Sequence, residues 1–134
     1  MSETSDEKTL AEAVDALADR FRAMPQSRLL GAVPGHPSRA AAGLALARWL
    51  AVTARAAEAV RADGGVPGPP ADELPDAGAF AVGDQLAVVG HDLAAALAVL
   101  PGDAAVALPD GPAVAAEAVR ALAVRRLAEA AAAL

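Results

Sequence analysis

The residues with the most chemical potential in this sequence stand close together, within residues 84–92. A carboxylate and an amide, Asp84 and Gln85, are followed by an imidazole and a second carboxylate, His91 and Asp92. In a helix Asp84 and His91 would share a face but lie about 10 Å apart along the axis, too far for direct contact. These four side chains are candidates for a ligand or partner site. The alternative is that they are solvated polar residues of an otherwise apolar helix.

Nucleophilic, phosphate and metal chemistry find no support in the sequence. The chain has no cysteine, and it lacks the Gly-x-Ser-x-Gly turn that exposes a nucleophilic serine. No glycine-rich loop with a basic residue fits a phosphate, and no Glu-x-x-His pair suggests a di-iron bundle. His36 falls in a Pro-Gly-His-Pro turn. We therefore expect no catalytic residue, no metal, no cofactor and no enzymatic activity.

Arginines form the second set of candidates. Arg39, Arg48, Arg55 and Arg61 fall in one predicted helix, and Arg48 and Arg55 mark its basic face. A DNA-binding regulator would use such a face. However, the net charge is −6 and asparagine, a common base-reading residue, is absent, so nucleic acid is not the expected partner.

Charge and composition are both uneven along the chain. Residues 25–62 carry five arginines and one glutamate, whereas residues 63–110 carry eight acidic residues and no basic one. Such blocks attract each other within a chain or between two chains, although solvated helix faces are the simpler interpretation. Alanine makes up nearly a third of the residues and aromatics 2%, a bias that suggests a high-GC bacterial genome. The core must then be built from leucine, valine and alanine.

Hydrophobic spacing predicts four helices, and no strand pattern is stronger than the helical alternative. The helices span about residues 6–24, 38–62, 77–100 and 111–132. In the first, Thr4 and Glu7 fit a capping box. Its apolar stripe consists of Leu10, Val14, Leu17, Phe21 and Met24. This helix must therefore bury one face.

The third predicted helix contains the first set of candidate residues, with Asp76 expected as its N-cap. Its apolar stripe consists of Val82, Leu86, Val89, Leu93, Leu97 and Leu100. Gly83 and Gly90 each weaken a helix by roughly 1 kcal/mol relative to alanine. Two interpretations stay open: a neighbouring backbone comes close at these glycines, or the positions are unconstrained.

The second and fourth predicted helices have weaker patterns. One side of the second consists of Leu46, Leu50, Thr53, Ala57 and Val60. Leu44 falls on the other side, which indicates a second contact surface. Before this helix, a short helical turn is expected to place Leu29 and Leu30 in the core. The apolar residues of the fourth helix scatter around its axis, so its buried face is undecided.

A linker of residues 63–75 holds four prolines and three glycines, so it excludes a regular element and lets the helices on either side pack in either direction. We predict one all-α domain of residues 1–134, a four-helix up-and-down bundle. No charge-free apolar run could span a bilayer and no basic-then-apolar leader opens the chain. We therefore expect a cytoplasmic protein without a membrane partner.

The expected function is that of a non-enzymatic helical interaction module. The surplus apolar surface of the second and fourth helices favours a homodimer, with another bacterial protein as a further partner. The first alternative is a bundle that binds a small ligand or acts as an enzyme. It requires Asp84, His91 and Asp92 to converge on a concave pocket. The second alternative is a DNA-binding regulator that uses the arginine-rich second helix.

Overall fold

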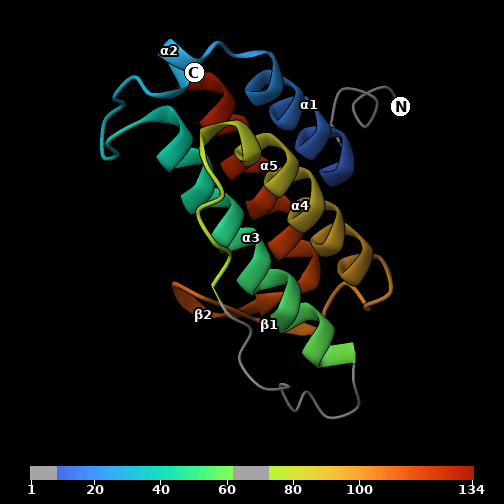
Figure 1. The fold of residues 1–134 in the computed structure, drawn as a ribbon. Helices are drawn as coiled ribbons and strands as arrows, with labels where there is room; N and C mark the ends of the chain where they lie inside the picture. Colours follow the sequence, from blue (N-terminus) through green and yellow to red (C-terminus); the bar gives the residue numbers. More distant parts are fainter. Residues whose placement is uncertain (1–8, 62–72) are drawn as a thin grey trace.

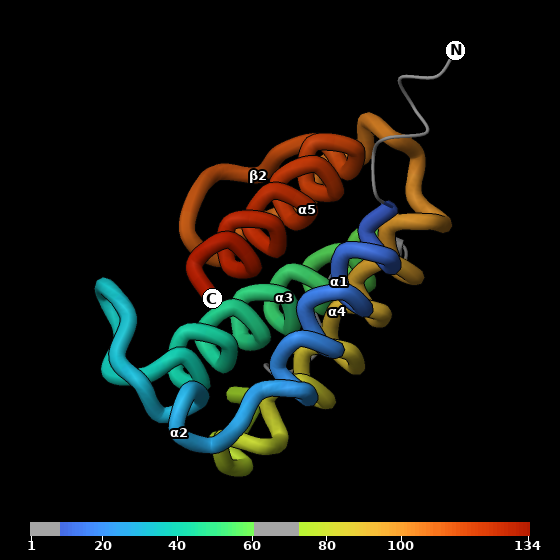
Figure 2. The backbone as a smooth tube through the Cα atoms, turned by 90° about the horizontal axis from the view of Figure 1, so that it is seen from above, coloured from blue at the N-terminus to red at the C-terminus, as the bar shows by residue number. Residues whose placement is uncertain are grey.

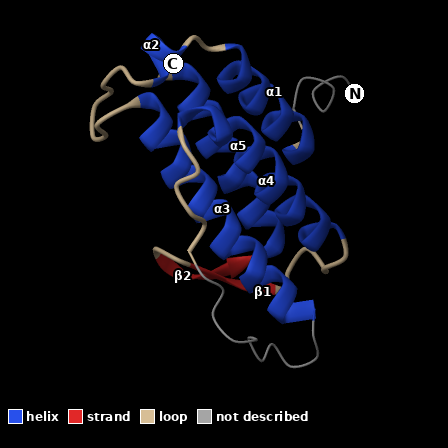
Figure 3. Ribbon diagram, in the orientation of Figure 1, coloured by secondary structure: helices blue, strands red, loops and turns tan. Residues whose placement is uncertain are grey.

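Four long helices make up most of the structure (Figure 1). The computed structural model describes residues 9–61 and 73–134. The long helices in these ranges are α1 (Leu10–Ala23), α3 (Arg39–Arg61), α4 (Val82–Ala98) and α5 (Ala116–Ala132). The shorter elements are α2 (Gln26–Leu29), the 3-10 turn η2 (Ala79–Ala81), and strands β1 (Ala105–Leu108) and β2 (Gly111–Ala115). The fold is thus mostly helical, with one small two-stranded sheet (Figure 3).

The apolar stripe predicted for α1 is buried, and a capping box begins the helix. The hydroxyl of Thr9 accepts a hydrogen bond from the backbone N–H of Glu12 at 3.1 Å, and the Glu12 carboxylate accepts one from the Thr9 N–H at 2.9 Å. The box expected at Thr4 and Glu7 lies outside the described residues. The stripe consists of Leu10, Val14, Leu17, Phe21 and Met24, all buried. The predicted amphipathic pattern of α1 is therefore confirmed.

The start of α4 differs from the prediction. Asp76 is not its N-cap, because η2 intervenes and the Asp76 carboxylate instead accepts a hydrogen bond from the N–H of Gly78 at 2.9 Å. Gly78 has φ +98°, a conformation that glycine adopts without steric cost. Beyond this turn the predicted stripe is buried at Val82, Leu86, Val89, Leu93 and Leu97, and Leu100 is half-buried after the helix ends.

Two glycines of α4 let α1 come close. A β-carbon built on Gly90 would lie 2.5 Å from Cγ2 of Val14. A β-carbon on Gly83 would lie 2.9 Å from the carbonyl oxygen of Ala18. Of the two interpretations of these glycines, the structure supports close approach of a neighbouring helix.

Helices α3 and α4 run in the same direction (Figure 1). Gly43, near the start of α3, faces Val82, the first residue of α4: a β-carbon on Gly43 would lie 2.7 Å from Cγ1 of Val82. The ring of Phe21, near the end of α1, also contacts this position: a β-carbon on Gly43 would lie 2.7 Å from Cζ of Phe21. Because the end of α1 meets the starts of α3 and α4, α1 runs opposite to both. The expected up-and-down order is therefore wrong, because α3 and α4, which follow each other in the sequence, begin at the same end of the molecule.

The described end of this return, residues 73–78, has no helix or strand and is held by side chains on both sides. Arg48 of α3 donates from Nε to the carbonyl oxygen of Leu74 at 2.8 Å, and its Nη2 lies 3.6 Å from the Glu73 carboxylate. Gln85 of α4 donates from Nε2 to the carbonyl oxygen of Pro75 at 2.8 Å. These contacts fix the connection against α3 and α4.

A β-hairpin occupies the place predicted for a connector and the first turn of the fourth helix. Strands β1 and β2 are antiparallel, with Val106 paired to Val114, and Val106 is fully buried. The absence of strands was therefore a wrong prediction. The alternation of valine with alanine, a weak strand former, conceals the pattern. Leu108 pairs with Gly111, so the hairpin loop is Pro109-Asp110 and not the Asp110-Gly111 dipeptide that usually marks such turns.

Helix α3 is buried on two sides. Leu44 and Leu50 are both buried, so the second contact surface that Leu44 indicated is present. Thr53 is fully buried, and its hydroxyl donates a hydrogen bond to the carbonyl oxygen of Trp49, its neighbour one turn earlier, at 2.7 Å. Of the leucines expected in the short turn before α3, Leu29 is buried but Leu30 is 54% exposed, so only one enters the core.

Helices α4 and α5 each pack against both α1 and α3, and α3 lies between them in Figure 2. The face that α5 buries consists of Ala116, Val119, Ala123 and Leu127. Two arginines bind carbonyl groups at and just beyond its last turn: Arg20 donates to the carbonyl oxygen of Ala131 at 2.7 Å, and Arg28 donates to that of Leu134 at 2.8 Å. Both cations also oppose the negative end of the helix dipole. The contact of Arg20 places the ends of α1 and α5 together, so these two helices are parallel.

Within residues 9–61 and 73–134, no helix combines the length and the apolar character needed to cross a bilayer.

Candidate functional site

The structure ties the predicted polar residues of α4 to α1. Asp84 accepts a hydrogen bond from Nε of Arg22 at 2.8 Å. This bond raises the pKa of the Arg22 guanidinium above its ordinary value, and the charges of Asp84 and Asp19 add to the effect. Nε2 of His91 lies 2.7 Å from Oδ1 of Asp15. Both pairs are exposed, so they join the outer edges of α1 and α4.

The remaining polar candidates of α4 also lie apart. Gln85 binds the return segment at Pro75, and its Oε1 is buried without a hydrogen-bond partner among the described residues. Asp92 is exposed. None of the four candidates lines the pocket or the groove described below. The structure therefore does not bring them together around one concave site.

The two residues of the expected basic face also differ in role. Arg48 is half-buried and holds the return segment, whereas Arg55 is exposed one helical repeat further on. Elsewhere in the described parts of the chain, no group of three histidine, aspartate or glutamate side chains is placed to hold a metal ion.

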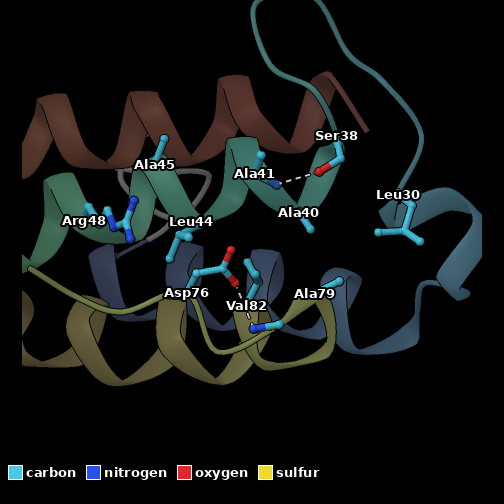
Figure 4. A pocket seen from close by; sticks show the side chains of 11 residues that line it. Leu30, Ser38, Ala40, Ala41, Leu44, Ala45, Arg48, Asp76, Ala79 and Val82 are labelled. Atoms are coloured by element: carbon cyan, nitrogen blue, oxygen red, sulfur yellow. Dashed lines mark hydrogen bonds between the residues drawn. The ribbon is translucent and has the colours of Figure 1, made fainter.

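A pocket of about 330 Å³ opens between α3 and the segment that leads into α4 (Figure 4). Its apolar walls include Leu30, Ala40, Leu44, Ala79 and Val82. The polar groups at its edge are engaged within the chain. The Ser38 hydroxyl accepts a hydrogen bond from the Ala41 N–H at 3.0 Å, Asp76 binds Gly78, and Arg48 binds Leu74.

A larger groove of about 450 Å³ separates α1 from α5. It is lined by Ala13, Ala16, Leu17, Arg20, Val124, Leu127, Ala128 and Ala131. All but Arg20 are apolar. Because four of the eight lining residues are alanine, their side chains are too short to interlock across the space between the two helices. One sequence feature indicates such a surface: apolar residues lie on several sides of the fourth predicted helix.

Charges of opposite sign flank this groove. On the α1 side Glu12 and Asp19 are exposed, and on the α5 side Arg120 and Arg125 are exposed. Asp19 pairs with Arg22 of its own helix at 3.2 Å. Arg120 and Arg125 have no hydrogen bond or ion pair within the described part of the chain. Apart from Arg20, which lines the groove itself and binds the carbonyl oxygen of Ala131, the α1 flank is therefore acidic. The α5 flank is basic and unpaired.

A polar cluster of Trp49, Asp110 and Arg126 fixes the hairpin turn to α3 and α5. Trp49 donates from Nε1 to Oδ1 of Asp110 at 3.1 Å, and Arg126 donates from Nη2 to Oδ2 at 2.8 Å. The Arg126 guanidinium also lies over the indole ring, 4.4 Å from its centroid. The hydrogen bond from Trp49 and then that from Arg126 lower the pKa of the Asp110 carboxyl below its ordinary value. The ionised carboxylate thus holds the hairpin against both helices.

No protein-family model, curated protein or solved structure matches this chain. The evidence for function therefore lies in the chain's own surfaces, above all in the groove between α1 and α5.

Proposed function

We propose that this protein is a non-enzymatic interaction module, a bundle of its four long helices that docks a protein partner in the groove between α1 and α5. The observation that carries the proposal is the groove itself, about 450 Å³ of apolar space between two helices of the surface. A partner that covers it removes from water the exposed or half-buried side chains of its lining, Ala16, Val124, Ala128 and Ala131, whereas Leu17 and Leu127 are already buried. An amphipathic helix suits a hollow of this shape.

The outward side of α5 supports the proposal. Ala121, Ala128 and Ala132 are exposed beside the groove, and alanine lets the backbone of a partner helix come near. The sequence predicts surplus apolar surface on this helix, and these exposed alanines support that expectation. The groove contains no side chain suited to general acid–base or nucleophilic catalysis, since its single polar residue is Arg20.

A photo-crosslinking residue at position 128 tests the proposal. Ala128 lines the groove, whereas Ala118 is exposed on the same helix and is not among the groove residues. In the full chain, purified and in a bacterial host, position 128 should form covalent protein adducts that position 118 does not. Ala16→Glu, which puts a charge in the groove, should abolish them. Equal yields from the two positions, or adducts that persist with Ala16→Glu, would overturn the proposal.

A further inference from the structure

We infer that the partner that covers the groove is a second copy of this chain, related by a two-fold axis parallel to α1 and α5; the inference rests on the proposed function. Such an axis places α1 of each copy over α5 of the other, so that four helices enclose both grooves. The interface is then the same surface on both copies, as two-fold symmetry requires. The charges beside the groove point to this arrangement.

Helical periodicity defines the two rows that would face each other. The row on α1 consists of Glu12, Ala16, Asp19 and Ala23, and the row on α5 consists of Arg120, Ala121, Val124, Arg125, Ala128 and Ala132. The α1 row carries two acidic residues and no basic one. The α5 row, where it lies level with α1, carries two arginines and no acidic residue, because Glu117 lies about one turn before the start of α1.

Charge decides between the two orientations that a two-fold axis in the interface allows. With the axis perpendicular to the helices, α1 would lie on α1 and α5 on α5, so that acidic residues face acidic residues and arginines face arginines. With the axis parallel to the helices, each acidic row meets a basic row. Opposite charges across an interface favour the second orientation and disfavour the first.

The register of this pairing follows from a contact within one copy. An axis parallel to the helices keeps every residue at its own height, and Arg20 is level with Ala131, to whose carbonyl oxygen it donates. Counting back at about 1.5 Å per residue, Glu12 lies about 12 Å and Arg125 about 9 Å below this contact. Glu12 is therefore within about 3 Å of the height of Arg125 in the second copy. Along the helix axis it lies between Arg125 and Arg120 of that copy.

The two partners of this pair have the free groups that it needs. Oε1 of Glu12 accepts the hydrogen bond from Thr9, which leaves Oε2 for a guanidinium. Arg125 has no partner within the described residues. The two-fold axis generates this ion pair twice, once at each edge of the interface. The alanines and Val124 lie between the two pairs.

Light scattering and sedimentation of the full chain over a concentration series test the inference. We expect a dimer that Ala128→Glu dissociates and Ala118→Glu does not. Glu12→Gln keeps a residue able to close the capping box but removes the charge, and it should raise the dissociation constant roughly fivefold, since two symmetric exposed pairs are lost. Arg125→Gln should act equally, and the double variant should add little. Asp92→Asn on α4 removes a charge away from the groove and should leave the constant unchanged.

The outcomes separate the inference from the proposed function. A monomer at every concentration overturns the inference, while adducts from position 128 to a different protein would still support an interaction module. A dimer that is insensitive to Ala128→Glu, or equally sensitive to Asp92→Asn and Glu12→Gln, also overturns it. Glu12 and Arg125 are exposed, so their variants keep the core intact and remain informative even where Ala128→Glu lowers stability.

Discussion

Gly90 of α4 lies directly against Val14 of α1. A β-carbon on this glycine would come within 2.5 Å of one methyl group of the valine and 2.6 Å of the other. These distances are shorter than van der Waals contact, so the spacing of α1 and α4 depends on the missing side chain. The glycine is the reason that two helices with fully buried stripes can approach so closely.

Gly90→Ala should destabilise the protein by about 1–3 kcal/mol, the usual cost of overpacking a core. This occurs although alanine is the better helix former by about 1 kcal/mol. Urea unfolding followed by circular dichroism measures the change. In a Val14→Ala background the same substitution should cost less, because the space is then available. Gly111→Ala is the control, since a β-carbon there meets nothing within 4 Å; equal losses at both glycines would contradict the packing explanation.

Leu93→Ala should lower the free energy of unfolding by about 2–5 kcal/mol, because the side chain is fully buried among the helices and leaves a cavity. Val88→Ala, on the same helix but at a 63% exposed position, should change it by less than about 0.5 kcal/mol. Chemical denaturation of both variants gives the comparison. Similar effects of the two would mean that this face of α4 is not the buried one.

Thr9→Ala should cost about 1 kcal/mol, because the N–H of Glu12 loses the hydroxyl that accepts its hydrogen bond. Thr9→Ser keeps that oxygen and should be nearly neutral. Thermal unfolding distinguishes the two. A loss of the same size with serine would show that the methyl group of Thr9, rather than the cap, stabilises α1.

Acid should release the hairpin before the helices unfold. The pKa of Asp110 is lowered in the folded state, so its contribution to stability is fully present above the ordinary value of 3.8 and is lost as the pH falls through the lower, folded value. Trp49 is the single tryptophan of the chain, and its fluorescence reports directly on the contact. Asp110→Asn should remove this pH dependence, and Asp103→Asn, in the turn before β1, should not. A pH profile that Asp110→Asn leaves unchanged would assign the transition to another group.

The parts of the fold that could be predicted are those in which large apolar residues recur at helical spacing. The stripes of α1 and α4 are such cases, since leucine and valine alternate there with polar residues. The hairpin was missed because Val106 and Val114 are embedded in alanines, which suit a helix better than a strand. The parallel direction of α3 and α4 could not be predicted either, because the long linker between them permits both directions.

The candidate site shows a similar limit. Asp84 and His91 could be placed on one face of a helix, but their partners, Arg22 and Asp15, come from α1. Pairing between helices depends on which faces meet, and spacing along one helix does not determine that. The groove could not be predicted from the sequence either, because it is formed by alanines on two helices that are distant in the sequence. Only the scattered apolar pattern of α5 indicated that a further surface existed.

The pairing of α1 with α5 has a consequence for synthesis of the chain. These helices are the first and the last of the four, so the groove between them exists only after residue 132 has left the ribosome. Shorter nascent chains can pack α1 against α4, but the side of α1 that faces α5 stays uncovered, and the acidic and basic rows are not yet together. If two copies associate as we infer, the interface can form only between copies in which α5 is already complete.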